Sequence, residues 1–363
     1  MSETTTASPS MRTGIVHALL AALLFGASTP FAKLLVGDMP PILLAGILYA
    51  GSGLGLGAWL AARALLRREV KSEASLTTVD LPWLAGAVLS GGILGPVFLM
   101  TGLSMTAAST ASLLLNLEGV LTAMLAWFVF REQFDRRIFI GMLLIIAGGV
   151  VLSISPATGP GGAGTVWRVL CIVAACLCWA IDNNLTRKVS ASDAVQIAAV
   201  KGLVAGSVNL VFSLAWLGVA LPEASQLAVA GLVGFCGYGL SLVLFVLALR
   251  HLGTARTGAY FSAAPFIGAA ISLALPGEQP GTFFWFAAIL MLLGIWLHVT
   301  ESHDHMHTHE HMLHAHPHYH DAHHQHAHDF PWDGKEPHVH PHEHAPLTHA
   351  HPHFPDIHHR HRH

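Results

Sequence analysis

The sequence has few charged residues and few cysteines. Lys, Arg, Asp and Glu together make up 11% of the 363 residues, whereas a soluble domain carries about a quarter. So few charges cannot cover a water-soluble globule, which excludes that class of protein. All four cysteines lie in apolar segments, so a disulfide framework is not expected.

Several functional motifs are also missing from the sequence. It contains no basic run of the kind that binds nucleic acid, no phosphate-binding loop and no recognisable catalytic constellation. We therefore expect neither an enzyme nor a nucleic-acid-binding protein, and no cofactor is required. Without an ATP-binding domain, any transport should draw on a proton gradient or another ion gradient.

Apolar residues are abundant, at 53% of the chain with a mean hydropathy of +0.55. A helix needs roughly 20 mostly apolar residues to cross a bilayer, and lipid offers backbone groups no other partner. The sequence thus predicts an all-α integral membrane protein with ten transmembrane helices, after a disordered N-terminus at residues 1–12. The predicted spans are residues 14–35, 41–62, 82–104, 107–129, 138–156, 166–187, 194–218, 226–249, 256–275 and 281–299.

The positions of Lys and Arg predict the orientation of these spans. With the N-terminus inside, twelve of these residues fall at cytoplasmic ends, and only Lys33 and Arg168 fall at outer ends. Cytoplasmic loops carry the excess of positive charge in membrane proteins. We therefore expect both termini to be cytoplasmic, in a bacterial-type inner membrane.

The apolar part of the chain is a duplication. The segment Phe25–Lys33 aligns with Trp179–Arg187 at an offset of 154, and Glu132-Gln133 aligns with Glu278-Gln279 at an offset of 146. A repeat of five helices, over residues 13–158 and 164–300, must run through the bilayer in opposite directions because five is odd. Inverted repeats are typical of secondary transporters, with the substrate site near the midplane.

Two five-helix halves, each with a Glu-Gln turn before its last helix, resemble the drug/metabolite transporter superfamily, and most closely its EamA-like branch. The resemblance covers residues 14–298. It implies a ten-helix inner-membrane carrier, often an exporter of small metabolites, with a fold that does not identify the substrate. The oligomeric state stays open, with a homodimer as one option.

Ionisable residues inside the predicted spans are candidates for the transport site. Glu118 follows Asn116 near the middle of the fourth span, where desolvation disfavours its charged form. We interpret Glu118 as a proton-coupling group, with a substrate ligand or a structural partner as alternatives. Asp182 and Lys201 lie at similar depth on consecutive antiparallel spans, where they can form an ion pair. That pair either lines the inner half of a cavity or is only structural.

A second polar stripe is weaker. Cys171, Cys178 and Asp182 share a face of the sixth span, and the repeat places His17 opposite Cys171. Thiol, imidazole and carboxylate groups together suit a transition metal in transit. The alternative is that the cysteines pack between helices as small apolar residues.

The last 63 residues differ from the rest of the chain, because 24 of the 27 histidines lie in residues 301–363. The pattern of His314–His328 recurs 35 residues later in His349–His363. Neutral imidazole is the commonest metal ligand, so we expect a disordered cytoplasmic tail that binds Ni²⁺, Zn²⁺, Co²⁺ or Cu²⁺. A pH-responsive spacer is the alternative. The candidate ligands are His314, His316, His318, His323, His324, His326, His328, His349, His351, His353, His358, His359, His361 and His363.

Three functions are compatible with these features. In the first, the apolar part carries an organic solute while the tail senses or buffers metal. In the second, it exports a transition metal that the tail captures. In the third, the protein stores or senses metal at the membrane without transport. The inverted repeat argues against the third, and the few metal-ligating groups in the spans argue against the second.

Overall fold

The computed structural model describes residues 9–66, 76, 78–130, 136–154, 163–189, 192–275 and 278–300, together with four short segments between residues 304 and 352. The chain divides into two units, which are taken separately below. Unit 1 comprises Met1–Leu252 and Arg256–Glu301, and unit 2 comprises Gly253–Ala255 and Ser302–His363.

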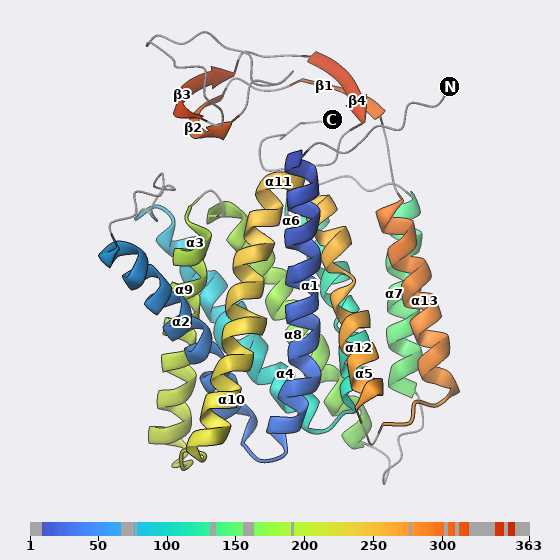
Figure 1. The fold of residues 1–363 in the computed structure, drawn as a ribbon. Coiled ribbons are helices and arrows are strands. Elements are labelled where there is room, and N and C mark those ends of the chain that lie inside the picture. Colours follow the sequence, from blue (N-terminus) through green and yellow to red (C-terminus); the bar gives the residue numbers. More distant parts are fainter. Residues whose placement is uncertain are drawn as a thin grey trace. The chain divides into compact units, whose positions relative to one another are not determined.

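The described secondary-structure elements of unit 1 are all helices (Figure 1). The helices of the first half are α1 (Pro9–Val36), α2 (Pro41–Leu65), α3 (Leu81–Ala87), the π-helical η1 (Val88–Leu94), α4 (Gly95–Ser104), α5 (Ala108–Leu114), α6 (Asn116–Phe130) and α7 (Arg136–Ile154). Those of the second half are α8 (Ala163–Val189), α9 (Ala194–Val211), the π-helical η2 (Phe212–Trp216), α10 (Ala224–Gly234), the π-helical η3 (Phe235–Leu240), α11 (Ser241–Phe261), α12 (Ala264–Ala274) and α13 (Thr282–Val299).

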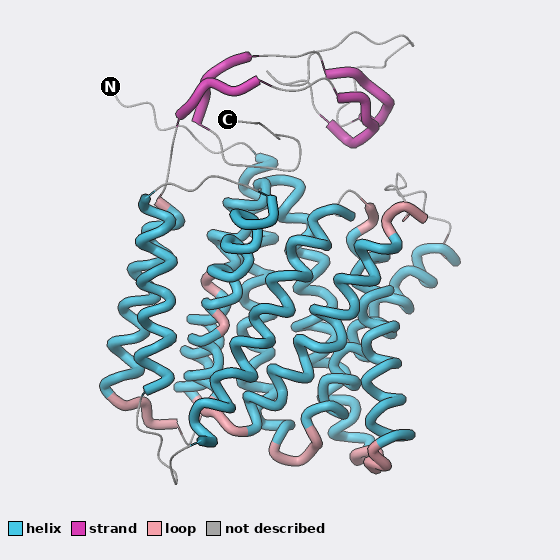
Figure 2. The backbone as a smooth tube through the Cα atoms, turned by 180° about the vertical axis from the view of Figure 1, so that it is seen from behind, coloured by secondary structure: helices cyan, strands magenta, loops and turns pink. Residues whose placement is uncertain are grey.

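These helices confirm the predicted integral membrane fold. Within the described residues, 9 helical segments are long and apolar enough to cross a bilayer, and Thr282–His298 is a shorter apolar helix at the position of the tenth predicted span. Figure 2 shows the helices of this unit running side by side. One boundary was wrong: α1 begins at Pro9, inside the N-terminus predicted to be disordered, since proline is well suited to the first position of a helix. Residues 1–8 lie outside the described part.

Each half of the chain packs mainly against the other half. Helix α2 lies along α9, and α7 lies along α13 (Figure 1). Helix α1 of the first half packs against α12 and η3, while α8 of the second half packs against α6 and η1. These pairings are related by exchange of the two halves, as an inverted repeat requires.

The helices are interrupted at equivalent positions in the two halves. The fourth span breaks at Leu115, between α5 and α6, and the ninth breaks at Ser262 and Ala263, between α11 and α12. These breaks fall within two residues of each other at the 146-residue offset. The π-helical turns η1 and η3 correspond at the same offset. Discontinuous helices near the midplane are a feature of transporter sites, and π-helical turns are frequent at functional sites.

The close packing of α2 on α9 depends on glycine. A Cβ atom at Gly53 would overlap the backbone of Gly202 and Leu203, and a Cβ atom at Gly202 would overlap the backbone of Gly53. Small residues let helix backbones approach each other in lipid, where dispersion replaces the hydrophobic effect. The glycines of the second span thus bring the two halves into direct backbone contact.

Unit 2 contains four strands, which corrects part of the prediction. Strand β1 (Asp304–Thr308) pairs antiparallel with β4 (Thr348–Pro352), and β2 (Met312–His318) pairs antiparallel with β3 (His338–His344). The expectation of a tail without regular structure is wrong for these segments. The physical reason is that histidine alternates with other residues there, which is the two-residue period of a strand. The remaining predicted ligands, such as His323 and His358, lie outside the described residues.

Candidate functional site

A buried ion pair lies between the sixth and seventh spans. The Lys201 ammonium on α9 is 2.6 Å from Oδ1 and 2.7 Å from Oδ2 of Asp182 on α8. The Thr186 hydroxyl donates to the same carboxylate at 2.8 Å, one helical turn further along α8. Both charged residues are almost fully buried: Lys201 is 3% exposed and Asp182 is 6% exposed. The structure therefore brings Asp182 and Lys201 together as the sequence predicted, while a role in transport stays a prediction.

Glycine makes room for this pair. A Cβ atom at Gly91, in the π-helical turn η1, would overlap the Asp182 carboxylate. At the equivalent place in the other half, a Cβ atom at Gly237 would overlap Ser28. Ser28 and Asp182 occupy equivalent positions in the two halves, at the offset of 154. Of these two positions, only that of Asp182 carries an ionisable side chain. The two halves share their backbone geometry and differ in the charge they carry.

Glu118 lies at the contact between the two halves. It is in the first turn of α6, just after the break in the fourth span, where the helix N-terminus favours a negative charge. Its Oε1 atom accepts a hydrogen bond of 2.9 Å from the side-chain amide of Asn183 on α8. The same amide lies 3.5 Å from the Thr122 hydroxyl, one turn along α6. Glu118 is partly exposed at the surface of the helical unit.

Asn116 marks the break itself. Its amide nitrogen donates to the Leu113 carbonyl at 2.9 Å and lies 3.7 Å from the Met291 sulfur. Its Oδ1 atom is buried and has no hydrogen-bond partner in the described part of the chain. The Asn116 side chain therefore binds a backbone carbonyl next to the break, while its own Oδ1 acceptor has no donor among the described residues.

Aromatic rings fill the centre of the interface, next to the carboxylates. Phe25 and Trp179, which correspond at the offset of 154, meet edge to face with ring centroids 5.7 Å apart. Phe25 also lies 6.0 Å from the Tyr238 ring. The Trp179 indole and the Tyr49 hydroxyl both donate to the Gly91 carbonyl, at 2.9 and 2.8 Å. Because a π-helical turn disturbs the regular backbone bonds, the Gly91 carbonyl can accept both donors.

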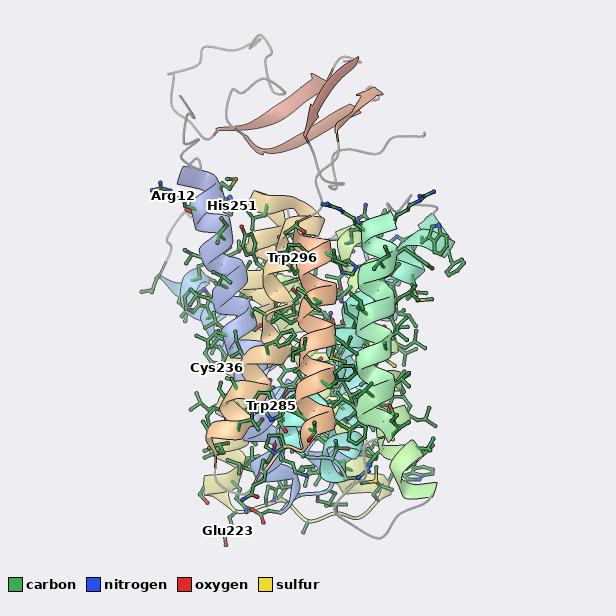
Figure 3. The ribbon with its side chains drawn as sticks, turned by 90° about the vertical axis from the view of Figure 1, so that its right-hand side faces the viewer. Arg12, Glu223, Cys236, His251, Trp285 and Trp296 are labelled. Atoms are coloured by element: carbon green, nitrogen blue, oxygen red, sulfur yellow. The ribbon has the colours of Figure 1, made fainter. Side chains whose placement is uncertain are left out.

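The predicted stripe of His17, Cys171 and Cys178 remains a prediction. The His17 ring lies 5.8 Å from the His251 ring, between α1 and α11. Figure 3 shows His251 and Arg12 at one end of the helical unit and Glu223 at the other. Cys171 is buried and Cys178 is partly buried. Among the described side chains, no group of three or more His, Cys, Asp or Glu residues could hold a metal ion.

A second carboxylate joins the two halves away from the central site. Glu278, in the segment before α13, accepts hydrogen bonds from the backbone N–H groups of Ala108 at 2.6 Å and Ser109 at 3.1 Å. Nearby, the Lys33 ammonium donates to the Leu103 carbonyl at 2.7 Å. Glu278 thus satisfies the first turn of α5 from the opposite repeat. Its repeat counterpart Glu132 lies outside the described residues.

Replacing Glu278 with glutamine should lower the stability of the protein by about 0.5–2 kcal/mol, the range for loss of a helix-capping acceptor. Glutamine keeps one oxygen but loses the charge and the second acceptor. The measurement is thermal unfolding of the purified protein in detergent. Glu223→Gln is the matched control, since Glu223 is exposed and precedes α10 with no side-chain cap. Equal effects of the two substitutions would contradict the capping role.

Sequence reasoning missed several residues of this region. Asn183, Thr186 and Gly91 were not singled out, although Asn183 and Asn184 are amides inside an apolar span next to Asp182. That signal could have found Asn183. Gly91 could not be found, because its proximity to Asp182 depends on the packing of η1 against α8.

Comparison with known proteins agrees with this architecture. A protein of Methanothermobacter thermautotrophicus described as an uncharacterized transporter is 28% identical over 300 residues, 78% of this chain and 85% of that protein. The uncharacterized inner membrane transporter YedA of Escherichia coli K12 is 23% identical over 298 residues, 77% of this chain and 91% of YedA. One protein of known crystal structure superposes with a TM-score of 0.59 at 17% identity, over 80% of this chain and 96% of that one.

The family comparison identifies both halves separately. The profile of the EamA-like transporter family matches residues 12–154 and again residues 166–300. These two matches cover the two halves that pack against each other. The chain is therefore a multi-pass membrane protein that belongs to the EamA-like transporter family.

Proposed function

We propose that the protein is a proton-coupled secondary transporter that exports a small organic solute across the inner membrane, with a tail that binds divalent transition metals. The observation that carries the transport part is the contact between Glu118 and Asn183. It joins α6 of the first repeat to α8 of the second, next to the break in the fourth span. A carboxylate at this place can link its own protonation to the relative position of the repeats.

The coupling follows from hydrogen-bond chemistry. An ionised carboxylate only accepts, whereas a protonated one also has an O–H group to donate. The Asn183 amide nitrogen, which donates at 2.9 Å, suits the ionised form. Proton uptake by Glu118 removes the charge that strengthens this bond, which weakens the link between the two helices. A ligand that binds one of two states better shifts the population toward it, and here the proton is that ligand.

An organic solute fits this site better than a bare metal ion. Asp182 is bound by Lys201 and Thr186, and Glu118 is bound by Asn183. A divalent cation would have to displace these donors. The tail then senses or buffers metal. Metal efflux with capture by the tail remains the second candidate, supported by the histidine content of residues 301–363, ahead of a metal store without transport.

The orientation is also part of the proposal. The excess of Lys and Arg on alternate loops supports cytoplasmic termini, and YedA is named as an inner membrane protein. This arrangement exposes the tail to cytoplasmic metal.

Export profiles of intact cells test the function. Cells that express the full chain, a chain ending at residue 300, or no chain are compared by metabolite analysis of the medium and by Ni²⁺ content after Ni²⁺ challenge. We expect the full and shortened chains to release the same organic solute, with only the full chain responding to Ni²⁺. Loss of cell-associated Ni²⁺ without release of a solute would favour metal efflux. If the cells show neither release of a solute nor loss of cell-associated Ni²⁺, the proposal of transport is overturned.

A further inference from the structure

Helix α5 is a short buried segment that lies between two breaks in the chain. The turn at residues 105–107 separates it from α4, and the break at Leu115 separates it from α6. Six of its seven residues are buried. It packs against α1 and α7 of its own half and against α8, α12 and α13 of the other half. The segment therefore lies between the two halves of the unit.

Helix α5 begins at the end of the unit opposite the N-terminus. Figure 1 shows α1 running through the helical unit from one end to the other, and Lys33 is in its last turn. The Lys33 ammonium donates to the Leu103 carbonyl, beside the turn that precedes α5. With the proposed cytoplasmic N-terminus, this end faces the outside. Helix α5 thus lies on the outer side of Glu118, which follows the break at Leu115.

The N-terminus of α5 is capped by the opposite half of the chain. The first N–H groups of a helix have no partner within it, and a Ser, Thr, Asp or Asn at the N-cap usually accepts from them. Here the N-cap is Ala107, and the Thr106 hydroxyl has no hydrogen-bond partner among the described residues. Instead, Glu278 accepts from Ala108 at 2.6 Å and from Ser109 at 3.1 Å. The cap is therefore present only while the two halves meet at this end.

The charges around the turn match the two helix ends that meet there. A helix N-terminus carries a partial positive charge and a C-terminus a partial negative charge. The Glu278 carboxylate lies at the N-terminus of α5, and the Lys33 ammonium lies at the C-terminus of α4. An anion from the second half and a cation from the first half thus stabilise the turn together.

The contacts at the inner end of α5 are weaker. The Leu114 carbonyl lies 3.7 Å from the Cys176 sulfur on α8, and a thiol is a weak donor. The Ser112 hydroxyl is buried and has no partner in the described part of the chain. The bonds to Glu278 are shorter and involve a charged acceptor, which makes them stronger. Glu278 is therefore the main polar link from α5 to the second half.

The other end of the unit has a link of a different kind. Arg63, in the last turn of α2, lies 3.1 Å from Asp193, the N-cap of α9. These two helices also approach each other closely at Gly53 and Gly202. The ion pair thus reinforces a contact that backbone packing already holds.

We infer that α5 is the outer gate of the transport path and that Glu278 is the latch that keeps it closed. The inference rests on the proposed transport function and orientation, and it names the element that closes the outer end. When the second half moves away at this end, Glu278 leaves the two N–H groups and α5 loses its cap. Weakening the latch shifts the population toward the open state.

The test is the access of a membrane-impermeant maleimide to a cysteine on α5 in right-side-out membrane vesicles. The vesicles contain the full-length chain with its native cysteines replaced by alanine and with Ser112→Cys, at a position that is 1% exposed. Adding Glu278→Gln should raise the labelling rate about 2- to 30-fold. That factor corresponds to the loss of a helix cap worth about 0.5–2 kcal/mol, at tenfold per 1.4 kcal/mol.

Three controls separate opening of the gate from general loosening of the fold. Ser213→Cys replaces a serine that is 0% exposed in η2, which follows α9, and Glu278→Gln should leave its labelling unchanged. Arg63→Gln breaks the link at the other end and should not alter labelling at Ser112→Cys. Glu278→Asp keeps the charge on a shorter side chain, so its labelling rate should lie between those of the native residue and glutamine.

Two results would overturn the inference. If Glu278→Gln leaves labelling at Ser112→Cys unchanged, or raises labelling at Ser213→Cys equally, Glu278 stabilises the fold without acting on a gate. If the maleimide reaches Ser112→Cys only in inverted vesicles, α5 does not close the outer end. Labelling requires no solute, so these results count against the gate alone, whereas export profiles without a released solute count against the transport function.

Discussion

Replacing Glu118 with glutamine should reduce proton-driven export to the level of cells without the protein, while exchange of the solute across the membrane continues. Glutamine has nearly the same shape and can still accept the Asn183 hydrogen bond, but it cannot take up or release a proton. The measurement uses proteoliposomes loaded with the solute identified from the export profiles. It compares efflux driven by an imposed pH gradient with exchange at equal pH.

Two further variants make this result specific to Glu118. Glu118→Asp keeps an ionisable group and should restore part of the gradient-driven efflux, because the shorter side chain still titrates. Glu223→Gln, at an exposed position on the unit's end (Figure 3), should leave efflux unchanged. If Glu118→Gln keeps the pH dependence of the native protein, Glu118 is not the coupling group.

Removing one partner of the buried ion pair should cost more stability than any other single change considered above. Asp182→Asn leaves the Lys201 ammonium, at 3% exposure, without its counter-ion. Breaking a buried pair in this way costs about 3–5 kcal/mol, because an uncompensated charge stays in a low-dielectric interior. Lys201→Met should have a smaller effect, since Thr186 still donates to the Asp182 carboxylate.

The double variant Asp182→Asn/Lys201→Met should recover much of the loss, since neutral groups of similar size replace both charges. Thermal unfolding in detergent gives the stabilities, and proteoliposome efflux gives the activity of each variant. A double variant that is stable yet inactive would assign the pair a role in transport. A stability change below about 1 kcal/mol for Asp182→Asn would contradict a buried, uncompensated charge.

Much of the helical unit could be predicted because lipid allows few solutions. Apolar runs of about twenty residues must be helices there, and the predicted spans agree with the observed ones to within a few residues at most ends. The duplication was readable from short matches such as Glu132 and Glu278. Strand formation in the tail was not predicted, because its prolines and low aliphatic content indicate disorder although its histidines alternate with the two-residue period of a strand.

The candidate site was only partly predictable. Which residues are ionisable is written in the sequence, whereas their contacts depend on how the helices pack. The membrane class, the spans and the duplication could be read from the sequence, because hydrophobic length and internal similarity are properties of a linear pattern. The sequence also pointed to Glu118, Asp182 and Lys201, because ionisable groups are rare in apolar segments.

The contacts of these groups follow from the fold in three dimensions. The Asn183 bond to Glu118 and the space that Gly91 leaves for Asp182 depend on how the two halves pack. The pairing of histidine with histidine in β2 and β3 likewise depends on register between segments far apart in the chain. Such contacts are set by close packing and backbone geometry in three dimensions, which no spacing along the sequence specifies.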